Sequence, residues 1–301
     1  GPVISVLLSF RRHLSAFFRE PTGAGQPYIN GQQLHNTVNG EEQRVMESHN
    51  LLKSQLRRGE STFGVTVSIG NPEVSYALGD LGLDWINFDM QHTILDVKTV
   101  AAMIQAMSYS ETVPIVRVPS NDLAIINKAL DFGAHAVIVP LVNSREDAEK
   151  AVRSSRYTPK GMRSFGHRAA LRDPDYTTTA DTEIMVIPQI ETEVAIHKLE
   201  EIVSTEGIDA IFCGPFDLSM SLGVFGQFDS PRFVKAAETI VSVCEEHSVA
   251  PGLLAPIGPV ENTIERGFKL ISLGGDLPML RGSVKKALER ARKAAKPEKQ
   301  N

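Results

Sequence analysis

From about residue 42 onward, short apolar runs alternate with longer amphipathic segments, and this alternation limits the possible folds more than any other feature. The apolar runs are nearly continuous, which is typical of parallel strands covered on both faces. The segments between them have helical periodicity, with Asn or Ser at several starts and Gly133, Gly207 and Gly267 at ends. The eight expected strands are 62–69, 84–91, 113–119, 134–142, 183–191, 210–219, 250–256 and 269–275, and the expected helices include 95–110, 121–133, 144–157 and 191–207.

Eight strands that alternate with helices predict an α/β fold, specifically a (β/α)8 TIM barrel. A doubly wound open sheet is the alternative. Such a sheet usually carries a glycine-rich phosphate turn after its first strand, and the sequence SIGNPEV that follows 62–69 is not GxGxxG. We therefore expect one barrel domain over residues 42–301, which ends in a helix and a charged tail.

Residues 1–41 differ from the rest of the chain. An apolar segment with Arg11, Arg12 and Arg19 is followed by a stretch rich in Gly, Asn, Gln and Pro that reads as a linker. We expect a flexible N-terminal extension that packs loosely or not at all. An amphipathic membrane-surface helix or an organelle-targeting segment in residues 1–20 is the alternative.

Composition excludes several classes of partner. The chain of 301 residues is 42% hydrophobic and 22% charged with a net charge of −5, and no basic cluster stands out in the part expected to be ordered, which disfavours nucleic acid. No apolar run approaches the roughly 18 residues of a membrane span, so we expect no membrane contact by the barrel. Two cysteines, Cys213 and Cys244, fit a reducing compartment and thus a cytoplasmic location.

Ionisable residues are concentrated at the ends of the predicted strands, where catalytic groups of a barrel lie. Asp89, Gln91 and His92 end the second strand, and Arg117 lies in the third. The fifth strand ends in Gln189 and Glu191, and the sixth in Asp217.

Glu191 and Asp217 are the strongest candidates for a metal site. Adjacent strands lie about 4.8 Å apart, so carboxylates at matched ends of neighbouring strands can converge on one cation. Two oxygen ligands without cysteine suit Mg²⁺ or Mn²⁺, with the remaining positions filled by water and substrate. Alternatively, each carboxylate caps the helix that follows it or meets a surface lysine.

Four other groups are candidates for substrate binding and proton transfer. Gln189 points to the same face of its strand as Glu191, or is a structural amide satisfied by backbone groups. Arg117 has apolar neighbours and needs an anionic partner, which is Asp89, Glu191 or the substrate. His92 shares a strand end with Asp89 and suits proton transfer near neutral pH. The turn at Gly214 offers backbone amides to a carboxylate, or is only a tight turn.

Residues 52–292 resemble the HpcH/HpaI family of class II pyruvate-dependent aldolases, which cleave 2-oxo-3-deoxy or 4-hydroxy-2-oxo acids. The strings that carry the resemblance occur in the family's order: GLDWINFDMQHT, VPIVRVPSND, LDFGAHAVIVPLV, SSRYTPKGMRSFGHRAA, PQIET and IFCGPFDLSMSLG.

The resemblance implies a role for each matching residue. Glu191 and Asp217 would hold a divalent metal, Mg²⁺ or Mn²⁺ with Co²⁺ as a further candidate, and no organic cofactor is implied. His92 would act as acid and base through a water, and Arg117 would stabilise the enolate oxyanion. The groups that would contact pyruvate are Gln189 and the backbone at Gly214, Phe216 and Asp217, and Asp89 would support the site.

The resemblance also implies an oligomer. The family pairs its histidine with an aspartate that matches Asp131, which the chain order places at the opposite end of the barrel. Asp131 would serve His92 only across a subunit interface, and similar proteins are hexamers, trimers of dimers that exchange a C-terminal helix. Gln91 departs from the pattern, since many members have Glu there, and the N-terminal extension is not part of it.

These observations predict a lyase that reversibly cleaves a 4-hydroxy-2-oxo acid to pyruvate and an aldehyde, with a divalent metal as Lewis acid. The alternative uses the same enolate to decarboxylate oxaloacetate, as in enzymes similar to macrophomate synthase. A more remote alternative is a barrel that has lost catalysis and serves as a binding subunit.

Overall fold

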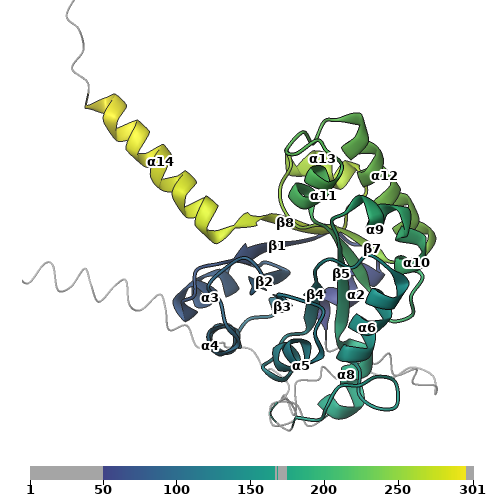
Figure 1. Ribbon diagram of the computed structural model, residues 1–301. Helices are drawn as coiled ribbons and strands as arrows, with labels where there is room; N and C mark the ends of the chain where they lie inside the picture. The colour runs from purple at the N-terminus through teal and green to yellow at the C-terminus, as the bar shows by residue number, and fades with distance from the viewer. Residues whose placement is uncertain (1–49, 167, 169–174, 296–301) are drawn as a thin grey trace, which may run out of the picture. The chain divides into compact units, whose positions relative to one another are not determined.

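Eight parallel strands close into a barrel in the order of the sequence, β1 to β8, with β8 paired to β1 (Figure 1). The computed structural model describes residues 50–166, 168 and 175–295. The closed barrel of eight parallel strands confirms the predicted (β/α)8 fold. The predicted extension, residues 1–41, lies outside the described residues, and the domain boundary at residue 42 stays a prediction.

Each of the eight predicted apolar runs contains one strand, and each strand is shorter than its run. The strands are β1 Thr62–Val67, β2 Trp85–Asp89, β3 Val113–Arg117, β4 Ala136–Val139, β5 Met185–Ile190, β6 Ala210–Cys213, β7 Ala250–Leu253 and β8 Leu270–Gly275. The polar residues predicted at strand ends therefore follow their strands or close them: Asp89 and Arg117 are the last residues of β2 and β3, and Glu191 directly follows β5.

Helices connect the strands, and several begin as the sequence predicts. Ser144 caps α6 as predicted, by accepting a hydrogen bond from a backbone N–H group of the first turn, whereas the cap of α5 is Asp122, one residue after the predicted start at Asn121. The helix predicted over 191–207 is instead two short helices, because Lys198 lies outside helical geometry at φ −110° and ψ 15°. The helices are α2 Leu51–Arg57, α3 Pro72–Gly79, α4 Val97–Ala106, α5 Leu123–Asp131, α6 Arg145–Ser155, α8 Tyr176–Glu183, α9 Glu193–His197, α10 Leu199–Val203, α11 Pro215–Ser221, α12 Pro231–Glu246, α13 Val260–Glu265 and α14 Asp276–Ala294.

Apolar side chains fill both the barrel interior and the layer between strands and helices. In the interior, Trp85 and Phe212 meet edge to face with ring centroids 5.7 Å apart. Leu52 and Leu56 of α2 belong to the same buried cluster, so this helix contributes to the interior core. The barrel interior is thus a packed core, and it supports the polar residues at the carboxyl ends of the strands. None of the described helices is both long and apolar enough to cross a membrane.

Gly64 of β1 makes room for the largest side chain of the interior. A Cβ at this position would lie 2.1 Å from the ring of Trp85 and 2.4 Å from its carbonyl oxygen. Because Gly64 and Trp85 are register partners in neighbouring strands, neither can move aside without disturbing the β1–β2 pairing.

We predict that Gly64→Ala lowers the free energy of unfolding by about 3 kcal/mol, the upper end for overpacking a core. The measurement is the urea unfolding midpoint, with Gly258→Ala as the matched control, because a Cβ at Gly258 meets nothing within 4 Å. A Gly64→Ala protein as stable as the Gly258→Ala protein would contradict this packing.

Candidate active site

A cavity of about 670 Å³ opens at the carboxyl ends of the strands and collects most of the predicted site residues. Arg117, Gln189, Gly214, Phe216 and Asp217 all line it. Thr66 of β1, residues 254–256 after β7 and the start of α14 complete the wall.

Asp89 and Arg117 form a buried ion pair across β2 and β3, where they are register partners. The Arg117 guanidinium donates to both carboxylate oxygens, from Nε to Oδ1 at 2.8 Å and from Nη2 to Oδ2 at 2.6 Å. Two parallel bonds fix the plane of the guanidinium as well as its position. Of the anionic partners that the sequence suggests for Arg117, Asp89 is the one it contacts.

The same guanidinium continues a polar chain toward β5. Arg117 Nη1 donates to Gln189 Oε1 at 3.4 Å, and the Gln189 amide nitrogen donates to Glu191 Oε2. The other carboxylate oxygen of Glu191 accepts a 2.7 Å hydrogen bond from the backbone N–H of Leu141, just after β4. As the strand periodicity predicts, Gln189 and Glu191 lie on one face, and each is fully or almost fully buried.

Glu191 is a buried carboxyl with a second acid close by. Burial raises the pKa of Glu191 above its ordinary value, while the hydrogen bonds from Gln189 and Leu141 act in the opposite direction. The negative charge of Asp217 raises the pKa further. A cation between the two carboxylates would relieve both the desolvation and the repulsion.

Gly214 brings the turn between β6 and α11 against Glu191 and Gln189. A Cβ at Gly214 would lie 3.0 Å from Glu191 Cβ, 3.1 Å from its Oε2 and 3.3 Å from the amide nitrogen of Gln189. The close approach places the first turn of α11, which contains Asp217, beside Glu191. Asp217 thus lies in a helix rather than at the end of a strand, three residues beyond the glycine that positions it.

The donor set fits a divalent cation with two protein ligands. In the described ranges no three His, Cys, Asp or Glu side chains gather as a metal site, so water and substrate would supply the other ligands. Asp217 lines the cavity, and hydrogen bonds orient the buried Glu191 beside it. Two such carboxylates match the oxygen preference of Mg²⁺ and Mn²⁺.

Two of the predicted catalytic residues do not reach the cavity within a single chain. His92 is exposed in the turn after β2, its backbone N–H lies 3.4 Å from Asp89 Oδ1, and its side chain is not part of the cavity wall. Asp131 ends α5 and pairs with Arg163 at 2.8 Å. Because α5 leads into the start of β4, Asp131 lies at the end of the barrel away from the cavity.

Three features of the site have little or no signal in the sequence. The Leu141 N–H that holds Glu191 comes from a residue with φ 54°, and a backbone donor cannot be recognised by residue type. Asp276, an acid after β8, accepts from the backbone N–H groups of Ser68 and Ile69 and so ties α14 to β1. Lys286 lines the cavity from the third turn of α14.

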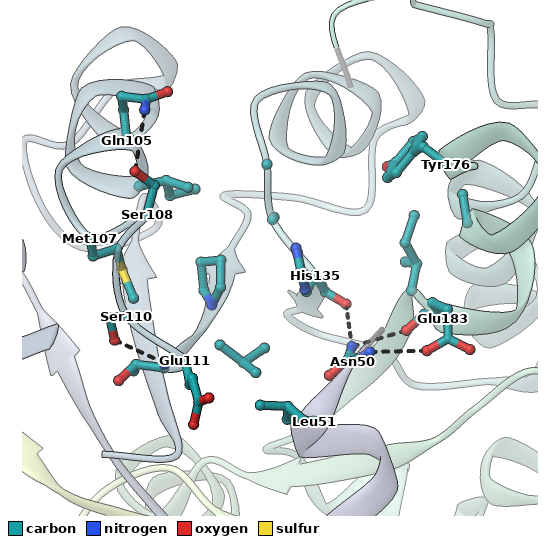
Figure 2. Close-up of a pocket in the computed structure, with 18 of the residues that line it drawn as sticks. Asn50, Leu51, Gln105, Met107, Ser108, Ser110, Glu111, His135, Tyr176 and Glu183 are labelled. Carbon is teal, nitrogen blue, oxygen red and sulfur yellow. Dashed lines mark hydrogen bonds between the residues drawn. The ribbon is translucent and has the colours of Figure 1, made fainter. Parts of the chain in front are cut away.

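A second cavity, of about 660 Å³, lies at the amino ends of β3 to β5 and contains none of the predicted catalytic or metal-binding residues (Figure 2). There the Asn50 side chain donates to the backbone oxygens of His135 and Glu183, which joins α2 to the starts of β4 and β5. In barrels of this kind the amino end contributes to stability rather than to chemistry. We therefore place the active site at the carboxyl end.

Fold and site together define a (β/α)8-barrel enzyme whose acidic, amide and guanidinium groups meet at the carboxyl ends of the strands. The model of the HpcH/HpaI aldolase/citrate lyase family matches residues 63–282, and the chain belongs to this family. It is accordingly an enzyme of the aldolase/lyase type.

Individual relatives match this chain over most of its length. A 5-keto-4-deoxy-D-glucarate aldolase of Escherichia coli O139:H28 is 33% identical over 249 residues, which are 81% of this chain and 97% of that protein. The structure of an HpcH/HpaI aldolase/citrate lyase family protein from Burkholderia cenocepacia J2315 has a TM-score of 0.77 and 31% identity, and the match covers 81% of this chain and 99% of that one. Macrophomate synthase has a TM-score of 0.74 at 25% identity, with 90% and 98% covered.

We predict that Asp89→Asn lowers the free energy of unfolding by about 3 kcal/mol or more, because the buried Arg117 charge loses its counterion. The double variant Asp89→Asn/Arg117→Met should recover part of this loss, since it removes the charge as well. Urea unfolding measures both. Glu60→Gln is the control, because the Arg58–Glu60 pair is exposed and its loss should leave the midpoint nearly unchanged. Equal effects of Asp89→Asn and Glu60→Gln would contradict the prediction.

Proposed function

We propose that the enzyme is a metal-dependent class II aldolase that reversibly cleaves a 4-hydroxy-2-oxo acid to pyruvate and an aldehyde. The observation that carries the proposal is the pair of neighbouring carboxylates, Glu191 and Asp217, beside the Arg117–Gln189 hydrogen bond at the cavity. The likeness to a 5-keto-4-deoxy-D-glucarate aldolase supports the same reaction type.

Glu191 and Asp217 would hold the metal, Mg²⁺ or Mn²⁺. When bound, such an ion acts as a Lewis acid that lowers the free energy of a pyruvate enolate. Gln189 and the backbone at Gly214, Phe216 and Asp217 would bind the pyruvate carboxylate, and their position in one cavity wall supports this role.

Arg117 would stabilise negative charge, and His92 would transfer the proton. In cleavage, the bond between C3 and C4 breaks, its electron pair forms the enolate, and the C4 hydroxyl loses its proton to a water held by His92. Arg117 holds the developing oxyanion through its Nη1, and the bonds of Nε and Nη2 to Asp89 keep the guanidinium in place. Protonation of the enolate at C3 then yields pyruvate, and the reverse sequence forms the oxo acid.

A second candidate reaction starts from the same enolate. Oxaloacetate would lose CO₂ to form it, and protonation or addition to another electrophile would follow. The likeness to macrophomate synthase supports this alternative. Measuring oxaloacetate loss with and without an aldehyde separates the two, because decarboxylation alone needs no acceptor.

We also propose that the enzyme works as a homo-oligomer, a hexamer built as a trimer of dimers with α14 exchanged between subunits. No residue of α14 is buried, and the side chains of Leu277, Leu280, Val284 and Leu288 form an exposed apolar stripe at helical spacing. A partnership between His92 and the Asp131 of a neighbouring chain would likewise require an oligomer. The cytoplasmic location indicated by the two cysteines stays a prediction.

We predict that EDTA abolishes formation of oxo acid from pyruvate and an aldehyde, and that Mg²⁺ or Mn²⁺ restores it. Asp217→Asn and Glu191→Gln should remain inactive at metal concentrations that saturate the wild type. Borohydride added with pyruvate should leave no adduct when intact mass is measured. A trapped lysine adduct, or full activity in EDTA, would exclude the class II mechanism.

We further predict that two inactive variants restore each other. In an equal mixture of His92→Ala and Asp131→Ala chains, unfolded and reassembled together, about a quarter of the active sites should unite an intact His92 with an intact Asp131. Activity of the mixture should therefore approach that fraction of the wild type, while each variant alone stays inactive. A mixture no more active than its components would show that Asp131 does not serve a neighbouring site.

A further inference from the structure

One face of α14 forms a wall of the active-site cavity. Five residues of α14 line the cavity. Counted from Pro278, the other four lie one, four, five and eight positions further on, which places all five on one side of the helix: Pro278, Met279, Gly282, Ser283 and Lys286. This face is distinct from the apolar stripe, so α14 can meet another chain on one side and the substrate on the other.

The start of this wall is held in place. The carboxylate of Asp276 accepts from the backbone N–H groups of Ser68 and Ile69 at 3.0 and 2.8 Å, and from the Ser68 hydroxyl at 2.7 Å. From Pro278 to Lys286 the helix rises by about 12 Å. Lys286 therefore lies at the far end of the cavity wall, while Arg117 and Gln189 lie at the strand ends.

Lys286 is the uncommitted positive charge of the cavity wall. The other cation there, Arg117, already makes two hydrogen bonds to Asp89 and one to Gln189. In the described part of the chain Lys286 has no ion-pair or hydrogen-bond partner, whereas its neighbour Lys285 lies 4.0 Å from Glu289 and outside the cavity. The Ser283 hydroxyl, on the same cavity-lining face one turn before, adds a second donor near Lys286.

We propose that Lys286 determines acceptor specificity by binding a carboxylate at the far end of the aldehyde. The inference rests on the proposed aldolase function, because it concerns the half of the oxo acid that becomes the aldehyde. No charge changes at that carboxylate during the aldol step, so Lys286 stabilises ground state and transition state alike. Its loss therefore raises KM much more than it lowers kcat.

The test compares two four-carbon aldehydes, succinate semialdehyde and the neutral butanal, in condensation with pyruvate and Mg²⁺. The wild type should prefer succinate semialdehyde in kcat/KM. Lys286→Met, which keeps the length of the side chain, should lower that preference by about tenfold or more, mainly through KM, and Lys286→Arg should retain most of it. Lys285→Met is the matched control and should retain the wild-type preference.

Two results would overturn the inference in distinguishable ways. If both aldehydes condense with pyruvate but Lys286→Met keeps the wild-type preference, the lysine has no part in specificity and the aldolase function stands. If the wild type condenses neither aldehyde, nor propanal or glycolaldehyde, with Mg²⁺ or Mn²⁺ present, the proposed function fails and the inference fails with it.

Discussion

A buried guanidinium held between a carboxylate and an amide is the interaction on which the catalytic end of this barrel depends. Arg117 joins β2 to β5 through Asp89 on one side and Gln189 on the other, and Gln189 passes the chain on to Glu191. Burying an isolated charge costs a large free energy, so each buried side chain of this polar chain depends on the hydrogen bonds and charges of its neighbours. The polar chain therefore links the register of the strands to the geometry of the site.

Charge balance explains why the site suits a divalent cation. Asp89, Glu191 and Asp217 contribute three negative charges when ionised, and Arg117 contributes one positive charge, which leaves two negative charges uncompensated. Burial is the main cause of the raised pKa of Glu191, and the negative charge of Asp217 raises it further. A divalent ion, if bound where Gly214 brings the α11 turn against Glu191, would supply the missing charge.

The sequence predicts the barrel and most of the site because both depend on periodic patterns. Eight apolar runs locate eight strands, and the acids, amide and arginine that interrupt or follow them lie at one end. Features that depend on how separate segments meet in space, or on local backbone geometry, cannot be predicted from these patterns. The Leu141 N–H that orients Glu191 is a backbone group, the break at Lys198 is a local backbone departure, and the place of Lys286 depends on the direction in which α14 leaves β8. The proposed partnership of His92 with Asp131 would require a second chain, which the sequence alone does not position.

The central claim is that the Glu191–Asp217 pair would hold a divalent ion that makes pyruvate easier to enolise, and deuterium exchange of the pyruvate methyl group tests it most directly. Proton NMR in D₂O needs no aldehyde and no product assay. We expect the methyl signal to decay with enzyme and Mg²⁺ or Mn²⁺, and to persist with EDTA or with Asp217→Asn. Exchange that continues undiminished in EDTA, or that never occurs with either metal, would contradict the claim.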